Sequence, residues 1–332
     1  MRNTIGNRLK KVFKNFVESV LQIFSKRMLV HFNNITQDIL LQKEDIIYET
    51  DLSNKHVTQS DVMASFNEFL TISAVLGRYH KPLSVEESSK LGNLKNKFHD
   101  KRCFIIGNGP SLNNTDLSFL KHEFSFGVNN IFYMTERNGF RPTFYVCEAQ
   151  HVIDANKEKI DTYDCEYRFF PTYFKPLLKE ALSNYYFYSD MSFYMPWHPL
   201  YAVALFSDDC SKVLYQGQTV TYICLQLAYY LGFKEVYLIG VDFDYTIPKS
   251  SIIKGNVVVS TEHDANHFDN NYFGKGKKWI LPQMEKQLIS LAKANAVYEN
   301  NGRKIYNATI GGKLELFERV NYQNIFSNSK KV

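Results

Sequence analysis

The sequence of 332 residues is long enough for one large α/β domain with an appendage or for two modest domains. Its 45% hydrophobic and 15% aromatic residues, with 22 tyrosines and 26 phenylalanines, exclude a disordered protein. The net charge of +5 arises within the first 33 residues, which hold seven basic residues and one acidic residue, so the near-neutral remainder does not indicate nucleic acid as a partner.

Residues 8–32 have the apolar periodicity of an amphipathic helix with a basic face. Such a helix suits an anionic membrane surface, and the alternative is packing against the main domain or a partner. A second helix is expected over residues 60–76, and residues 82–97 have the composition of a linker. We therefore expect a basic helical extension with a linker over residues 1–95 and the main domain over residues 96–325.

The five cysteines show no paired spacing, and several lie in apolar runs; they are Cys103, Cys147, Cys165, Cys210 and Cys224. This pattern predicts buried thiols in a reducing compartment, not disulfides or a zinc site. No apolar run approaches the ~20 residues that span a bilayer, and charges between Lys10 and Lys26 interrupt any signal-peptide core. We expect a cytoplasmic protein, peripheral on the inner face of the cell membrane if residues 8–32 bind lipid.

From Lys101 onward, short apolar runs alternate with helical patterns. Strands are predicted over residues 103–106, 124–128, 143–147, 167–170 and 236–239. A helix is predicted over residues 219–231, where Gly232 ends it. The alternation predicts right-handed crossovers and a Rossmann-like α/β fold with a mostly parallel sheet and flanking helices. Ligands of such sheets bind beyond the carboxyl ends of the strands, which here carry Asn129 and Glu148.

The strand over residues 103–106 runs into a loop of small residues that is typical of a phosphate-binding turn. Gly107 and Gly109 permit a sharp reversal, and Pro110 suits the first turn of a following helix. Asn108 and Ser111 add short polar groups beside the amides that such a turn leaves free. An ordinary strand-to-helix turn is the alternative. The dinucleotide fingerprint and the P-loop are both excluded, because the third glycine and the Gly-Lys-Ser/Thr ending are missing.

A second loop follows the strand over residues 236–239. Gly240 permits close approach of a ligand, and Asp242 is a candidate for a ribose hydroxyl or a metal ion. With Asp244 it forms an Asp-x-Asp pair, which nucleotide-sugar transferases use to hold a divalent cation, although so short a pattern is common. Tyr245 is expected either to contact a ligand or to be structural.

Two further segments carry candidate groups. Thr219 and Thr221 open the helix over residues 219–231, and a helix N-terminus with hydroxyl groups suits a phosphate or a carboxylate; capping alone also explains one of them. His267 lies in a polar loop and is a candidate general base, since histidine side chains titrate near neutrality. His263, Asp264 and His267 are alternatively metal ligands, although the neighbouring asparagines favour a loop over the helix that this spacing needs.

With these motifs assembled, the chain resembles the bacterial CMP-sialic-acid-dependent sialyltransferases of the Campylobacter type. Residues 107–112 are similar to the opening motif of that family, and Asn129 matches the asparagine after its second strand. Residues 231–243 are similar to its second signature, and His267 lies where it carries a catalytic histidine. The resemblance covers roughly residues 100–275.

An equally close or closer resemblance is to the domain family named after the archaeal 6-hydroxymethylpterin diphosphokinase MptE. Residues 217–221 and 307–315 look like its bacterial members, many of which are encoded beside surface-polysaccharide genes. That family is in turn similar to the flagellin nonulosonate transferases called motility accessory factors.

Two positions depart from the sialyltransferase pattern. Just before Thr219 that family carries an arginine and a serine, whereas this chain has Gln218 and Gly217. Its third strand ends in asparagine, whereas this chain has Glu148. A carboxylate there disfavours an anionic donor unless it binds a hydroxyl group or a cation.

The resemblance implies a glycosyltransferase that moves an acidic sugar, a sialic-acid-like nonulosonate or Kdo, from a CMP-activated donor to a surface-glycan acceptor. Residues 107–111 and Asn129 would hold the nucleotide, with Thr219 and Thr221 near its phosphate, and His267 would deprotonate the acceptor. The basic N-terminal helix fits a lipid-linked acceptor. Because a CMP donor has one phosphate, no cofactor is required, and Mg²⁺ or Mn²⁺ is optional.

Two other functions stay open. An ATP-dependent diphosphokinase acting on a pterin-like alcohol would need Mg²⁺ and would make Asp242 and Asp244 essential. A scaffold in polysaccharide assembly would keep the nucleotide fold without catalysis. The sequence predicts neither the oligomeric state nor the sugar and linkage.

Overall fold

The computed structural model describes residues 81–195, 198, 200–254 and 257–327. The helices predicted over residues 8–32 and 60–76 lie outside the described residues. The predicted boundary between residues 95 and 96 therefore stays a prediction.

An eight-stranded sheet forms the centre of the domain, and every strand pairing in it is parallel. Its order is β13-β12-β8-β1-β2-β3-β4-β5. The strands are β1 Arg102–Ile106, β2 Phe124–Val128, β3 Phe144–Val146, β4 Tyr167–Pro171, β5 Asn184–Phe187, β8 Glu235–Ile239, β12 Lys304–Asn307 and β13 Glu318–Arg319. The predicted Rossmann-like, mostly parallel sheet is confirmed, and β5, β12 and β13 are additional to the predicted strands.

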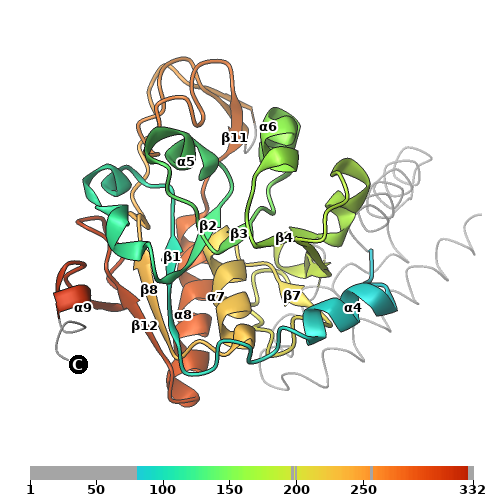
Figure 1. The fold of residues 1–332 in the computed structure, drawn as a ribbon. Coiled ribbons are helices and arrows are strands. Elements are labelled where there is room, and N and C mark those ends of the chain that lie inside the picture. The colour runs from blue at the N-terminus through green and yellow to red at the C-terminus, as the bar shows by residue number, and fades with distance from the viewer. Residues whose placement is uncertain (1–80, 196–197, 199, 255–256, 328–332) are drawn as a thin grey trace, which may run out of the picture. The chain divides into compact units, whose positions relative to one another are not determined.

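Helices cover both faces of this sheet (Figure 1). The helices are α4 Val85–Gly92, α5 Phe132–Asn138, α6 Gln150–Thr162, α7 Val220–Leu231, α8 Met284–Asn300 and α9 Asn324–Ser327. Apolar side chains of α7 and α8 pack on one face, and those of α5 and α6 pack on the other. The structure is thus a three-layer α/β/α arrangement.

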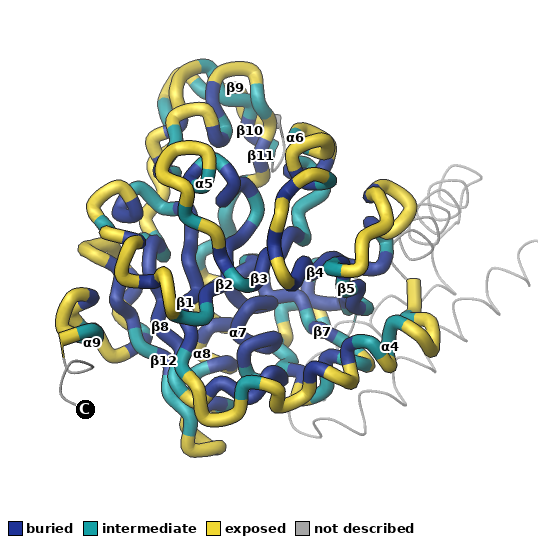
Figure 2. The backbone as a smooth tube through the Cα atoms, in the orientation of Figure 1, coloured by how far each residue is buried: buried dark blue, intermediate teal, exposed yellow. Residues whose placement is uncertain are grey.

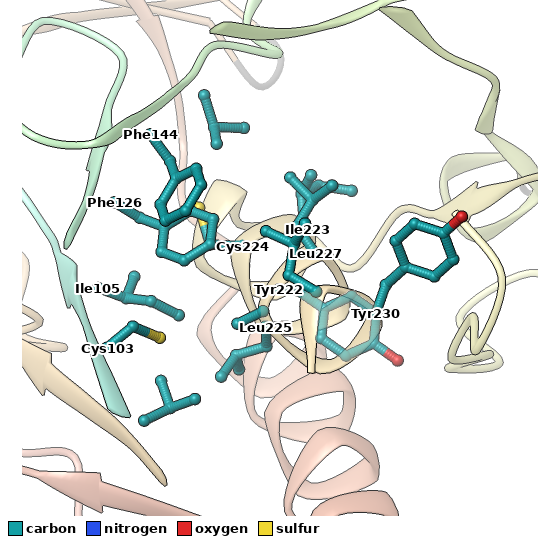
Figure 3. Packing of buried hydrophobic residues seen from close by; sticks show 14 of the residues in the cluster. Cys103, Ile105, Phe126, Phe144, Tyr222, Ile223, Cys224, Leu225, Leu227 and Tyr230 are labelled. Carbon is teal, nitrogen blue, oxygen red and sulfur yellow. The ribbon is translucent and has the colours of Figure 1, made fainter. Parts of the chain in front are cut away.

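Side chains alternate between the two faces along each strand. In β1, Cys103 and Ile105 belong to the cluster beneath α7, whereas Phe104 and Ile106 belong to the opposite cluster. Because both faces are covered, the strands are continuous apolar runs and are buried along most of their length (Figure 2). Figure 3 shows the sheet residues Cys103, Ile105 and Phe126 pointing toward α7.

Local signals explain where α7 begins and ends. The Thr219 hydroxyl accepts the Thr221 N–H at the start, and Gly232 ends the helix with a φ of 96°. All but one of its 12 residues are buried, because it lies between the sheet and α8. Both predicted ends of this helix are confirmed.

The segment predicted to be a linker is instead a capped helix. Ser84 and Glu87 form a capping box at the start of α4. Leu91 and Leu94 are buried in the cluster beneath α7. The linker interpretation was wrong because the polar residues of this helix face solvent and only its C-terminal part supplies apolar contacts.

Two smaller sheets lie outside the central one. The strands β6 Ser189–Asp190 and β7 Leu214–Tyr215 pair in parallel. The strands β9 Ile252–Lys254, β10 Val257–Val259 and β11 Lys278–Ile280 form an antiparallel sheet. Figure 1 shows β11 and its loops beyond the carboxyl ends of the central strands, near α5 and α6.

The strand order reverses between β1 and β8, which defines the switch point where ligands of such sheets bind. The chain passes from β1 outward to β5 and returns through α7 to β8 on the other side. Because α7 precedes the parallel strand β8, its first residue lies at the carboxyl edge of the sheet.

All five cysteines are buried and unpaired, as predicted. Within residues 81–327, apart from the undescribed gaps, no helix has the length and apolarity to cross a membrane.

Candidate functional site

The candidate site lies at the carboxyl edge, where the loops after β1 and β8 meet. Gly107 N–H donates to the carbonyl of Ile239 (2.8 Å), and Gly109 N–H donates to that of Gly240 (2.9 Å). A Cβ atom on Gly107 would overlap the Gly240 carbonyl, and one on Gly109 would overlap the Asp242 carboxylate. Glycine is required at both positions because the two backbones pass within hydrogen-bonding distance.

The expectation that this loop offers free amides to a phosphate is wrong for three of its amides. The Gly107 amide donates to the last residue of β8, and the Gly109 amide donates to the loop after it, which we call the β8 loop (residues 240–245). The Ser111 amide donates to Asp242 in the same loop. Pro110 is the first residue of the short 3₁₀ helix η1 Pro110–Asn114, as predicted. The small residues therefore serve the close packing of two strand ends.

Asp242 is held by Ser111. Ser111 Oγ donates to Asp242 Oδ2 (2.7 Å), and Ser111 N–H donates to Oδ1 (3.3 Å). Burial raises the pKa of Asp242, and the hydrogen bonds from Ser111 oppose part of that shift. Asp244 pairs instead with Lys313 (Oδ1 to Nζ, 2.9 Å).

The two carboxylates of the Asp-x-Asp motif thus have different partners and do not form a shared cation site. The described residues contain no group of three or more histidine, cysteine or carboxylate side chains that could hold a metal ion. The arrangement fits neither of the predicted metal alternatives, Asp242 with Asp244 or His263 with Asp264 and His267.

Three asparagines after β1 and β2 have buried polar atoms without a hydrogen-bond partner among the described residues. These atoms are Asn108 Oδ1, Asn129 Oδ1 and Asn130 Nδ2. Asn108 Nδ2 donates to the Val128 carbonyl and to Tyr272 Oη, both at 2.9 Å, which fixes the orientation of the amide. Buried polar groups nearly always have partners. Two acceptors and one donor therefore have unsatisfied hydrogen-bonding capacity.

Three of the six described non-glycine residues with positive φ lie at the carboxyl edge of the sheet, and the other three are Asn96, Asp100 and Ala202. The three at this edge are Asn129, Gln218 and Phe243, with φ values of 48°, 66° and 51°. Non-glycine residues adopt this region at an energetic cost and do so most often at functional sites. Gly240 is also in this region, with a φ of 64°.

The segment between β10 and β11, which we call the His267 loop (residues 261–277), carries the predicted general base. Asp264 Oδ2 lies 2.8 Å from His267 Nδ1. The N–H groups of Asn266 and Phe273 donate to the same carboxylate, each at 2.8 Å. Burial raises the pKa of Asp264, but these hydrogen bonds outweigh it and leave the pKa below its ordinary value.

The carboxylate of Asp264 fixes the tautomer of His267. Because it accepts the proton on Nδ1, Nε2 carries the lone pair, and no described residue bonds to Nε2. The ring of Tyr272 stacks on the imidazole, with 4.0 Å between centroids and an interplanar angle of 3°. A carboxylate that orients an imidazole is the arrangement of a positioned general base.

The His267 loop is attached directly to the loop of residues 107–111 after β1, which we call the Asn108 turn. Phe268 N–H donates to the Asn108 carbonyl (2.9 Å). Arg137 of α5 donates to the Phe268 carbonyl and pairs with Asp269, both at 3.1 Å. The structure therefore places His267 beside the Asn108 turn, as the predicted mechanism requires.

The remaining predicted residues lie at the same edge. The rings of Tyr245 and His267 are 6.5 Å apart between centroids, in an edge contact. The hydroxyl of Thr219 caps α7, whereas Thr221 is buried in the first helical turn. The ligand-binding roles of these side chains stay predictions.

Two residues that the sequence did not assign to this role complete the arrangement. Asp264 was considered only as a metal ligand, although an acidic residue three positions before a candidate base is a recognisable signal. Thr309 Oγ1 accepts the Val241 N–H (3.2 Å) and joins the chain after β12 to the β8 loop. No local pattern in the sequence indicates this contact.

Comparison with known proteins identifies one family. The model of the family described as 6-hydroxymethylpterin diphosphokinase MptE-like matches residues 79–248, which is just over half of the chain. None of the curated proteins compared with the chain matches it significantly.

Two solved structures are similar to this chain. One is the MAf glycosyltransferase from Magnetospirillum magneticum AMB-1, with 18% identity and a TM-score of 0.41 over 80% of this chain and 43% of that one. This chain thus spans less than half the length of that protein. The other is the sialyltransferase CstII from Campylobacter jejuni, solved in complex with cytidine-5′-monophosphate, with 17% identity and a TM-score of 0.39 over 67% of this chain and 85% of that one.

Proposed function

The chain belongs to the 6-hydroxymethylpterin diphosphokinase MptE-like family, and on this premise we propose that it is a glycosyltransferase. The donor is a CMP-activated acidic sugar, either a sialic-acid-like nonulosonate or Kdo, and the acceptor is a surface glycan. The observation that carries the proposal is the Asp264–His267 pair beside the Asn108 turn, where Nε2 is the nitrogen left for a substrate.

The asparagines without partners supply the nucleotide site in this proposal. The acceptor atoms Asn108 Oδ1 and Asn129 Oδ1 suit the amino group of cytosine or the ribose hydroxyls. The donor atom Asn130 Nδ2 suits the carbonyl oxygen of the base. The phosphate lies toward the start of α7, where the helix dipole at Thr219 and Thr221 favours an anion.

His267 then acts as the general base. Its Nε2 takes the proton of the acceptor hydroxyl while that oxygen forms a bond to the anomeric carbon of the donor sugar. The bond from the anomeric carbon to the phosphate oxygen breaks, and CMP leaves with the electron pair. Asp264 stabilises the imidazolium that forms, because it already accepts the Nδ1 proton.

We propose that this reaction requires no metal ion and that Mg²⁺ or Mn²⁺ is at most an accessory. The leaving group is CMP, which carries a single phosphate and so has no diphosphate for a cation to bridge. Asp242 and Asp244 are bound instead to Ser111 and Lys313. The acceptor is proposed to be lipid-linked, with the basic segment of residues 8–32 at the cytoplasmic face of the membrane. That segment lies outside the described residues.

The description of the family favours a second candidate, an ATP-dependent diphosphokinase acting on a pterin-like alcohol. It would need Mg²⁺ held by Asp242 and Asp244, which would first have to leave their present partners. Thermal-shift measurements separate the two candidates. Stabilisation by CMP or CTP supports the glycosyltransferase, and stabilisation by ATP with Mg²⁺ supports the diphosphokinase.

The decisive experiment measures CMP release from CMP-sialic acid and CMP-Kdo with a panel of glycan acceptors. His267→Ala is expected to lower the rate by about 10²-fold or more, because general-base catalysis contributes about that much. His263→Ala is the matched control, since this exposed histidine lies in the same loop. Absence of CMP release with every acceptor, or an unchanged rate in His267→Ala, would refute the proposal.

A further inference from the structure

Tyr272 lies in the His267 loop and contacts both parts of the candidate site. Its N–H donates to the Asp269 carbonyl (3.0 Å), so the chain turns back toward His267 within a few residues. Its side chain is 2% exposed and belongs to the apolar cluster that packs against α5 and α6. The ring and the hydroxyl group of this one side chain make two different contacts.

The hydroxyl group of Tyr272 binds two of the three asparagines that have unsatisfied polar atoms. Its oxygen accepts from Asn108 Nδ2 (2.9 Å) and from the backbone N–H of Asn130 (3.4 Å). Asn130 is 1% exposed, and its N–H has no other acceptor among the described residues. Because Asn108 follows β1 and Asn130 follows β2, the hydroxyl group fixes the two loops relative to each other.

The ring of Tyr272 packs face to face on the imidazole of His267, with 4.0 Å between centroids and 3° between planes. Asp264 binds this imidazole at Nδ1 (2.8 Å). A single hydrogen bond at one edge lets the imidazole tilt about that bond, and the face contact restricts the tilt. The direction of Nε2 therefore depends on Asp264 and Tyr272 together.

Apolar packing alone accounts for neither contact. The cluster that buries Tyr272 is otherwise aliphatic and aromatic, so a phenylalanine would pack there equally well. The one polar group of this side chain instead lies against two asparagines of the proposed nucleotide site. The backbone makes a parallel connection, because the Asn108 carbonyl accepts from Phe268 N–H (2.9 Å) directly after His267. Tyr272 thus joins with its side chain the same two elements that the backbone joins.

We propose that Tyr272 is a positioning residue that connects nucleotide recognition with general-base catalysis. Its hydroxyl group orients Asn108 and Asn130 for the nucleotide, and its ring orients His267 for the acceptor hydroxyl. This inference rests on the proposed function. Because the two contacts use different parts of one side chain, they act on different quantities: the hydroxyl group on the affinity for CMP, and the ring on kcat.

Tyr272→Phe removes the hydroxyl group and keeps the ring. Isothermal titration calorimetry of the full chain is expected to show CMP binding about 2- to 12-fold weaker than in the wild type, which is the value of one neutral hydrogen bond. The kcat of CMP release at saturating donor is expected to be unchanged, because the stacking on His267 is retained. CMP-N-acetylneuraminic acid and CMP-Kdo are the donors, with an acceptor that is active in the wild type.

Tyr272→Leu removes the ring as well. Its affinity for CMP is expected to equal that of Tyr272→Phe, but its kcat is expected to be lower by about 10- to 100-fold, because a misplaced catalytic group costs up to about 10²-fold. NMR provides a structural readout. The ring current of Tyr272 is expected to shift the carbon-bound protons of His267 upfield of those of the exposed His263, in the wild type and in Tyr272→Phe but not in Tyr272→Leu.

Tyr322→Phe is the matched control for the loss of a buried hydroxyl group. Tyr322 is 4% exposed, and its hydroxyl group donates to the Asp116 carbonyl (2.9 Å). This variant is expected to have a lower Tm but wild-type CMP affinity, kcat and His267 shifts. Thermal unfolding followed by circular dichroism gives the Tm of all three variants and identifies effects that come from lower stability alone.

The outcomes separate the two proposals. Wild-type CMP affinity in Tyr272→Phe would overturn the role of the hydroxyl group, and equal kcat in Tyr272→Phe and Tyr272→Leu would overturn the role of the ring. If Tyr272→Leu does not fold, equal shifts of His267 and His263 in the wild type would still overturn the latter. These results leave the proposed function intact, because the wild type still binds and releases CMP. Absence of CMP binding and release by the wild type would overturn the proposed function and this inference together.

Discussion

Replacement of Asp264 by asparagine tests the positioned-base arrangement with almost no change in shape. In the structure, Oδ1 of Asp264 accepts from Asn266 N–H, and Oδ2 accepts from His267 Nδ1 and Phe273 N–H, all at 2.8 Å. An amide has only one oxygen. Whichever way it is oriented, its NH₂ group faces a backbone N–H that then has no acceptor.

The expected losses of stability and activity follow from the hydrogen bonds that the variant cannot form. One buried N–H left without a partner costs about 1–3 kcal/mol of stability, which lowers Tm by about 2–12 °C for a domain of this size. The imidazolium also loses its anionic partner. A hydrogen bond to a charged group contributes about 1.5–3 kcal/mol, so kcat is expected to fall about 10- to 160-fold, with little change in the KM for the donor.

Three measurements check this expectation. CMP release gives kcat and KM, thermal unfolding followed by circular dichroism gives Tm, and long-range ¹H–¹⁵N NMR identifies the protonated nitrogen of His267. Glu262→Gln is the matched control, since that exposed carboxylate lies two residues before Asp264 in the same loop. If Asp264→Asn retained wild-type kcat with Nδ1 still protonated, the reasoning on Asp264 would be refuted.

Two other substitutions follow from the packing and the pH dependence. Gly109→Ala is expected to lower the free energy of unfolding by about 1–3 kcal/mol, because the added Cβ overlaps the Asp242 side chain. Gly92→Ala is the control: no atom lies within 4 Å of its added carbon, so the free energy of unfolding should change by less than about 0.5 kcal/mol. Equal unfolding midpoints of the two variants in urea would contradict the predicted overlap at Gly109. Glu148 has a pKa raised from 4.5 to about 7 in the folded protein, so its contribution to stability is full below pH 4.5 and is lost as the pH rises to 7. Glu148→Gln should therefore be more stable than the wild type at pH 8 by about 1–3 kcal/mol and equally stable at pH 4, and a difference independent of pH would argue against the shift.

The strands nearest the switch point were predictable because strands buried on both faces are uninterrupted apolar runs. The five predicted strands correspond to β1, β2, β3, β4 and β8 within one residue at each end. The outer strands were not found. β5 begins at Asn184 and β12 runs from Lys304 to Asn307, so polar residues interrupt the apolar pattern of both.

The site was predictable in location but not in detail. Parallel topology alone brings the Asn108 turn and the β8 loop to one edge, and the His267 loop follows β8 in the chain. The role of Gly109 was not predictable, because a glycine shows that something approaches closely without showing what. Its neighbour Asp242 lies 133 positions away in the chain. The resemblance to the MptE-like family, by contrast, is confirmed by the family match.

The hydrogen-bonded contact between the loops after β1 and β8 also has a consequence for biosynthesis. Ser111 is hydrogen-bonded to Asp242 in this contact, although the two residues are 131 positions apart in the chain. At translation rates of about 5–20 residues per second, Asp242 is synthesised about 7–26 seconds after Ser111. During that interval β1 has an unpaired edge with apolar side chains on both faces. An unpaired apolar edge favours aggregation, so slower elongation between these residues would prolong the interval in which the nascent chain is exposed to it.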